Sequence, residues 1–177
     1  MKILNKIPRR EKIIPVFAVI VMMLYTWSLL HFFWRLPSWL NFSTLGQIAT
    51  LFSYMVNVNL IESVLVLLGL ITLCVIFPSS WFYDRFVTGA VSLVLFALGG
   101  LMALNQYMLD DILSPEKMLA RFAAFVAAIF VLTFLVDRVS ILKKGLEELA
   151  NRMVVFLYIW MPISALSLLT MAIRNIF

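Results

Sequence analysis

The stretch IIPVFAVIVMMLYTWSLLHFFW, residues 13–34, decides the class of this protein, because it contains no Asp, Glu, Lys or Arg. A helix of about twenty apolar residues spans the roughly 30 Å hydrocarbon core of a bilayer. Similar charge-free stretches follow at 63–83, 86–109, 122–136 and 153–173. Only 13% of the residues are charged, whereas a soluble domain carries about 25%. The sequence therefore predicts an all-α fold, a polytopic membrane helix bundle.

We place five transmembrane helices in the sequence and expect them to form a single membrane-embedded domain over residues 1–177. Residues 1–12 form a basic tail before the first span, as in a signal peptide. The first apolar stretch ends in bulky residues without a small-residue cleavage site, so it reads as a retained helix. The predicted spans are 13–34, 58–78, 86–106, 118–137 and 153–173.

The basic residues predict the orientation of the spans. With the N-terminus inside, the segments 1–12, 79–85 and 138–152 carry five, one and four of the 14 Lys and Arg residues. Four remain outside, and this bias predicts a cytoplasmic N-terminus and an external C-terminus in a plasma (inner) membrane. Because the positive charge lies at span ends, it indicates contact with lipid headgroups and argues against nucleic acid as a partner.

Two polar segments fall between the predicted spans. Residues 36–57 are too polar for a span, and counting 44–60 as a sixth helix would put the basic segment 138–152 outside. We expect an outer interfacial segment, with an amphipathic helix capped by Ser43 or Thr44 as one form of it. The alternative is one joined helix over 44–77, about 50 Å long, bent around Asn57 to Asn59. Residues 138–152 predict an inner amphipathic linker helix with Leu142, Leu146 and Leu149 on one face.

Small residues at helical spacing predict packing faces in the third and fourth spans. Such spacing lets helix backbones approach closely in lipid. We expect contacts between these helices within the chain, with a contact to another protein as the alternative. In the fifth span, Pro162 should kink the helix. The kink would be a fixed feature of the helix shape, with a hinge for gating as the alternative. The small residues are Gly99, Ala103, Ala120, Ala124 and Ala128.

Glu62 is the one carboxylate within the apolar sequence. A buried charge in a span normally has a partner or a function, and Arg35, Arg121 and His31 are the candidates at the outer level. We expect an ion pair, with a proton or substrate site as the alternative. His31 could also bind a pigment or haem in a larger assembly. With Cys74 as the single cysteine and His31 as the single histidine, a bis-histidine haem site or a His- or Cys-rich metal site within the chain is excluded. Any other cofactor is left open.

The five-span layout with an external C-terminus resembles the membrane domain of lipoteichoic-acid-synthase-type phosphoglycerol transferases. That resemblance implies a membrane domain that accompanies an external catalytic domain. The residues themselves show no catalytic constellation, which favours a non-catalytic accessory or structural subunit of a larger membrane complex. The partners would be other membrane subunits or a second copy. The alternatives are a small oligomeric transporter or lipid-handling protein using Glu62 and the kinked helix at Pro162, or an enzyme acting on lipid headgroups through Glu62, Arg35, Arg121 and Asp110-Asp111.

Overall fold

The computed structural model describes residues 8–77, 85–108 and 115–176, and these residues form five α-helices. All five are long and apolar enough to cross a membrane, which confirms the predicted all-helical fold with five candidate spans. The helices are α1 (Arg10–Phe42), α2 (Leu45–Ile76), α3 (Phe86–Met108), α4 (Pro115–Arg138) and α5 (Ser140–Ile176).

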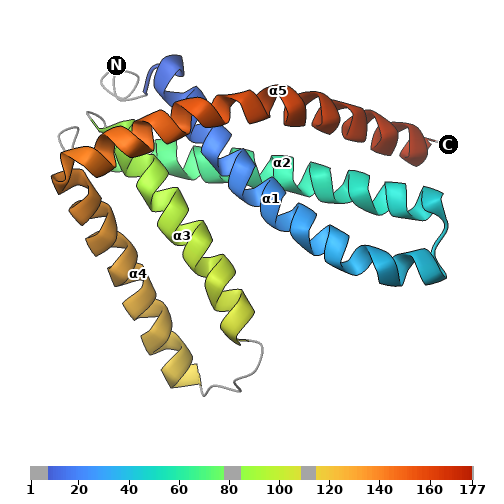
Figure 1. Cartoon of the computed structure of the whole chain (residues 1–177), viewed down its shortest axis with the longest axis horizontal. Helices are drawn as coiled ribbons and strands as arrows, with labels where there is room; N and C mark the ends of the chain where they lie inside the picture. The colour runs from blue at the N-terminus through green and yellow to red at the C-terminus, as the bar shows by residue number, and fades with distance from the viewer. Residues whose placement is uncertain (1–7, 78–84, 109–114, 177) are drawn as a thin grey trace.

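The helices form two arms that diverge from a shared end (Figure 1). The long arm holds α1, α2 and α5, which contact one another, and the short arm holds α3 and α4. The shared end contains the first turns of α1, α3 and α5 and the last turns of α2 and α4. This arrangement alternates the direction of successive helices, as a chain that crosses a membrane five times requires.

The polar segment 36–57 does not form a separate element. Its first part ends α1, and its second part begins α2 after a short turn at Ser43 and Thr44. Thr44 Oγ1 accepts a hydrogen bond from the Gln47 amide at 3.4 Å, and Gln47 Oε1 accepts one from the Thr44 amide at 2.9 Å. This capping box confirms Thr44 as the cap. The structure therefore follows the alternative prediction of one joined helix over 44–77, since α2 runs from Leu45 to Ile76.

The polar residues of this segment are compatible with a helix because some bond to their own helix and others face the bundle. Ser53 is buried and donates a hydrogen bond to the Ala49 carbonyl at 3.0 Å. Asn57 is also buried and faces the bundle, with 4% of its surface exposed. The 32 residues of α2 measure about 48 Å, and α1 and α5 are of similar length, well over the bilayer core of roughly 30 Å.

Residues 138–152 are not a separate linker helix, because α5 runs without a break from Ser140 to Ile176. In this part of α5, Leu142 is 49% exposed, whereas Ala150 is completely buried. Glu147 does not point away from the protein but accepts a hydrogen bond from Thr88 Oγ1 of α3 at 3.0 Å. The small side chain of Ala150 permits close contact with the core, and this contact sets which face of α5 turns inward.

Two groups of buried apolar side chains hold the helices together. The larger lies towards the shared end and includes Val16 and Ile20 of α1, Cys74 of α2, Phe86 of α3 and Ala150 of α5. The smaller lies within the long arm and consists of Val21, Tyr25 and Val56, with partly buried side chains of α5 around them. The two clusters position the middle of α1 against both α2 and α5.

Candidate functional site

The hydroxyl of Tyr25 joins the three helices of the long arm. Its oxygen lies 3.2 Å from the Val56 carbonyl oxygen of α2 and 2.8 Å from Ser164 Oγ of α5. Ser164 Oγ lies in turn 2.7 Å from the Trp160 carbonyl oxygen. The rings of Tyr25 and Trp160 pack with their centroids 4.7 Å apart. Tyr25 and Ser164 are each only 1% exposed, so this contact is closed to the outside.

Two arrangements place a hydrogen between the Tyr25 and Ser164 oxygens, because each hydroxyl has one hydrogen to donate. In one, Tyr25 donates to the Val56 carbonyl and accepts from Ser164. In the other, Tyr25 donates to Ser164, which donates to the Trp160 carbonyl. In both, each hydroxyl is satisfied by a neighbour, and the groups involved carry no charge. The contact therefore holds the three helices together through uncharged groups.

A second set of polar contacts lies beside the first. Ser28 of α1 donates a hydrogen bond to Asn59 Oδ1 of α2 at 2.8 Å, and Ser63 donates to the Asn59 carbonyl at 2.6 Å. On the other side of α2, the Asn57 amide lies against the sulfur of Met171 in α5. Among the described residues, Asn57 Oδ1 and Asn59 Nδ2 have no hydrogen-bond partner. Unpaired buried polar atoms are costly, so the two asparagines contribute less stability than their burial suggests.

Glu62 lies on the outside of the long arm, midway along α2. Its side chain is exposed, and the structure gives it no hydrogen bond or ion pair within the described residues. Its exposed neighbours are apolar, with Ile61 59% and Leu65 60% exposed. Because α2 begins at Leu45 and not at residue 58, Glu62 is also farther from the helix end than the predicted span boundaries imply.

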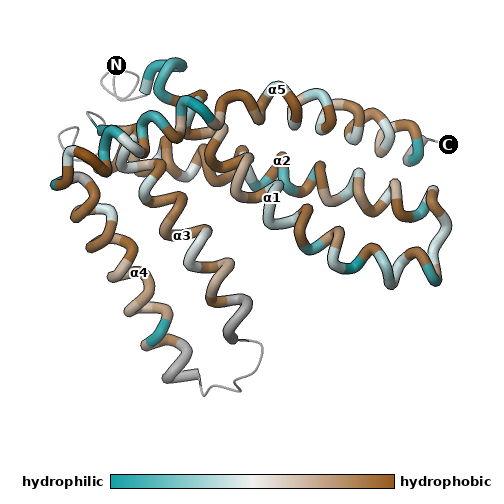
Figure 2. Tube along the Cα trace, viewed as in Figure 1, coloured by the Kyte–Doolittle hydropathy of each residue, from teal (hydrophilic) through white to brown (hydrophobic). Residues whose placement is uncertain are grey.

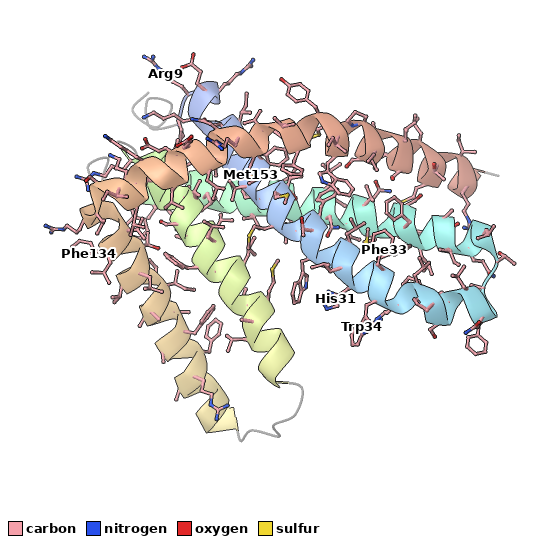
Figure 3. The ribbon with its side chains drawn as sticks, viewed as in Figure 1. Arg9, His31, Phe33, Trp34, Phe134 and Met153 are labelled. Carbon is pink, nitrogen blue, oxygen red and sulfur yellow. The ribbon has the colours of Figure 1, made fainter. Side chains whose placement is uncertain are left out.

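The other members of the predicted polar cluster lie on different helices. His31 is partly exposed on α1, with Nδ1 3.0 Å from the Trp27 carbonyl oxygen and its ring 4.4 Å from the Trp27 ring. Figure 3 shows His31 and Trp34 along the side of α1 that faces away from α5. Arg35 is exposed one turn further along α1, and Arg121 is exposed on α4 in the short arm. The described structure shows no ion pair between Glu62 and these side chains.

The contact between α3 and α4 uses a glycine other than the predicted one. A Cβ atom at Gly100 would overlap the ring of Phe125, whereas Gly99 faces Met23 of α1, with 3.7 Å between its Cβ position and Met23 Cε. On α4, the aromatic side chain fills the space that the small-residue pattern assigns to alanines. The remaining predicted packing residues, Ala103, Ala120, Ala124 and Ala128, are exposed.

Pro162 lies within the continuous helix α5 and is exposed. Ser164, two residues later, donates to its own helix at the Trp160 carbonyl and also contacts Tyr25. The loop acids Asp110 and Asp111 lie outside the described residues. Within the described ranges, no three His, Cys, Asp or Glu side chains gather in a way that could hold a metal ion.

The polar contacts of Tyr25, Ser28 and Asn59 were not singled out as a site from the sequence. Their signal is a set of hydroxyl and amide side chains inside stretches that otherwise lack polar residues, which favours hydrogen bonds between helices. Which of these side chains bond to one another depends on how α1, α2 and α5 are rotated about their own axes. Comparisons with protein-family models, with curated proteins and with solved structures find no match to this chain.

Proposed function

We propose that this protein is a non-catalytic structural subunit of a larger membrane complex. The observation that carries the proposal is the open, two-armed shape of the chain. Its accessible surface is 12143 Å² for a mass of 20.3 kDa, whereas a compact water-soluble monomer of this mass exposes about 8,800 Å². A second polypeptide packed between or along the arms would cover the additional surface.

The short arm supports the same proposal. Over Leu119–Val136, the most apolar part of α4, only 11% of the residues are buried. Large side chains such as Phe130 and Phe134 are 58% exposed. Phe134 points away from α3 (Figure 3). Helix α4 also exposes Ala120, Ala124 and Ala128, and small residues at this spacing are typical of helix contacts in membranes.

We propose that the shared end of the helices faces the cytoplasm. Hydrophilic residues gather there at the start of α1 and in the first turns of α5 (Figure 2). They include Arg9, Arg10, Lys143 and Lys144. Basic residues remain preferentially on the cytoplasmic side of a membrane, so the C-terminus of α5 would lie outside.

A transporter built from this chain alone has less support. Charged groups on a transport path face the interior of a bundle or a water-filled cavity, whereas Glu62 lies on the exposed side of α2. The polar groups that do lie inside the long arm, around Tyr25 and Asn59, are uncharged and packed against neighbouring side chains.

The test is purification of the tagged chain from its native membrane, expressed at its natural level, in a mild detergent. We expect a second polypeptide to accompany it in a fixed stoichiometric ratio through size-exclusion chromatography. The same chain expressed alone in a foreign membrane should lack that partner. A monomer or homodimer obtained from the native membrane would contradict the proposal.

A further inference from the structure

Resting on the proposed function, we infer that the exposed side of α2 around Glu62 binds a transmembrane helix of another polypeptide, and that this helix carries a Lys or Arg opposite Glu62. The surface consists of Val58, Glu62, Leu65, Gly69 and Thr72, and we call it the Glu62 face. All five residues are exposed, and nothing in the described structure covers the carboxylate.

The level of Glu62 along the helices gives the first argument. The hydrogen bonds from Tyr25 to the Val56 carbonyl and from Ser28 to Asn59 place α1 beside α2. The two helices run in opposite directions, and Glu62 lies a few residues beyond Val56 and Asn59 along α2. It is therefore level with the part of α1 between Val19 and Tyr25, inside the charge-free stretch 13–34. When α1 spans a membrane, the carboxylate lies within the hydrocarbon layer.

The chemistry of the surroundings gives the second argument. Val58 is 51% exposed and Leu65 is 60% exposed, so the carboxylate stands on an otherwise apolar surface. Lipid chains offer an ionised carboxylate neither water nor a counter-charge. A basic side chain from a neighbouring helix supplies both the opposite charge and hydrogen-bond donors.

The shape of the Glu62 face gives the third argument. The residues follow one another at intervals of four, three, four and three, the spacing of a seam between two packed helices. Gly69 lies on this seam, and a Cβ atom built there would meet nothing within 4 Å. An open glycine lets a second helix backbone approach closely. Thr72 donates to the Leu68 carbonyl of its own helix at 2.8 Å, so it needs no partner in the seam.

A second copy of this chain is a poorer occupant. A symmetric dimer through the Glu62 face would bring two carboxylates together, because the same surface patch is used on both copies. The apolar stretches contain no Lys or Arg, since the cations nearest to them are at Lys12, Arg35, Arg85, Arg121, Arg138, Arg152 and Arg174. Charge complementarity therefore favours a different polypeptide.

The experiment compares Glu62→Gln and Gly69→Leu with the wild-type chain in the native-membrane purification. Each variant should reduce the co-purified partner by about tenfold or more. The matched controls are Glu11→Gln, an exposed carboxylate at the start of α1, and Gly46→Leu, another glycine with open space around its Cβ position. Both controls should retain the partner. The melting temperature of the isolated chain should not fall in either test variant, because Glu62 is exposed and a Cβ atom at Gly69 would meet nothing within 4 Å.

A photo-crosslinking residue at Leu65 identifies the occupant. The captured peptide should come from a different polypeptide and contain a Lys or Arg within an apolar stretch. A peptide from a second copy, a crosslink to lipid alone, or a captured helix without a basic residue would overturn the inference. If the partner remains with both test variants, the inference fails while the proposed function stands. If the wild-type chain brings no partner, the proposed function itself fails.

Discussion

The hydroxyl oxygen of Tyr25 lies 2.8 Å from Ser164 Oγ, although 139 positions separate the two residues in the sequence. Through this contact and the bond to the Val56 carbonyl, one side chain of α1 sets the positions of α2 and α5. Hydrogen bonds between membrane helices contribute roughly 0.6 kcal/mol on average and up to about 1.7. The contribution of the Tyr25 hydroxyl to stability is therefore large enough to measure.

We expect Tyr25→Phe to lower the free energy of unfolding by about 1 kcal/mol, because the ring remains packed on Trp160 while the hydroxyl is lost. The measurement is reversible unfolding in detergent or lipid micelles. Tyr54→Phe is the control, since Tyr54 is 41% exposed. The loss from Tyr25→Phe and Ser164→Ala together should be smaller than the sum of the separate losses, because both remove the same hydrogen bond. Fully additive losses would show that the two hydroxyls do not interact.

Ser28 and Asn59 offer a test of the unpaired amide. Ser28→Ala removes the donor to Asn59 Oδ1, leaving that side chain with neither amide atom paired, and should destabilise the protein by about 1–2 kcal/mol. Adding Asn59→Leu should recover much of the loss, because it replaces the buried polar group with an apolar one of similar size. If the double variant were less stable than Ser28→Ala, the Asn59 amide would have found other partners once the Ser28 hydroxyl was removed.

Gly100 and Ala124 should respond differently to enlargement. Gly100→Leu places a side chain where Phe125 already lies and should cost about 1–3 kcal/mol by overpacking. Ala124→Leu should leave the stability of the isolated chain unchanged, because Ala124 is exposed. Thermal unfolding of the purified chain compares them. Equal destabilisation by the two variants would place the alanine face of α4 in the contact with α3.

Reporter fusions test the proposed orientation. A reporter active only outside the cytoplasm should be active when fused after Phe177 and silent when fused after Gly145. The reason is the excess of basic residues in 1–12 and 138–152. Silence at Phe177 together with activity at Gly145 would reverse the orientation. Activity at both positions would contradict a crossing by α5.

Thr44, Gly100 and Phe125 show which features of the fold a sequence pattern can predict. The cap at Thr44 is local, because its bonds connect residues three apart, and the sequence predicts it with Ser43 as the alternative. The contact of Gly100 with Phe125 was not, because the spacing of small residues fits several faces of a helix equally well. In the same way, polarity over 36–57 indicated a surface segment, whereas Ser53 and Asn57 are buried within α2.

The sequence by itself determined that this protein consists of helices long and apolar enough to span a membrane, and how many there are, because these properties follow from the charge and hydropathy of contiguous residues. Only the tertiary structure decided which side of each helix faces its neighbours. It turned Tyr25 and Asn59 inward and left Glu62 outside. The physical reason is that helices such as α2 carry apolar residues on almost every face. Hydropathy therefore says little about how each helix is rotated about its axis, and packing between distant segments decides which face turns inward.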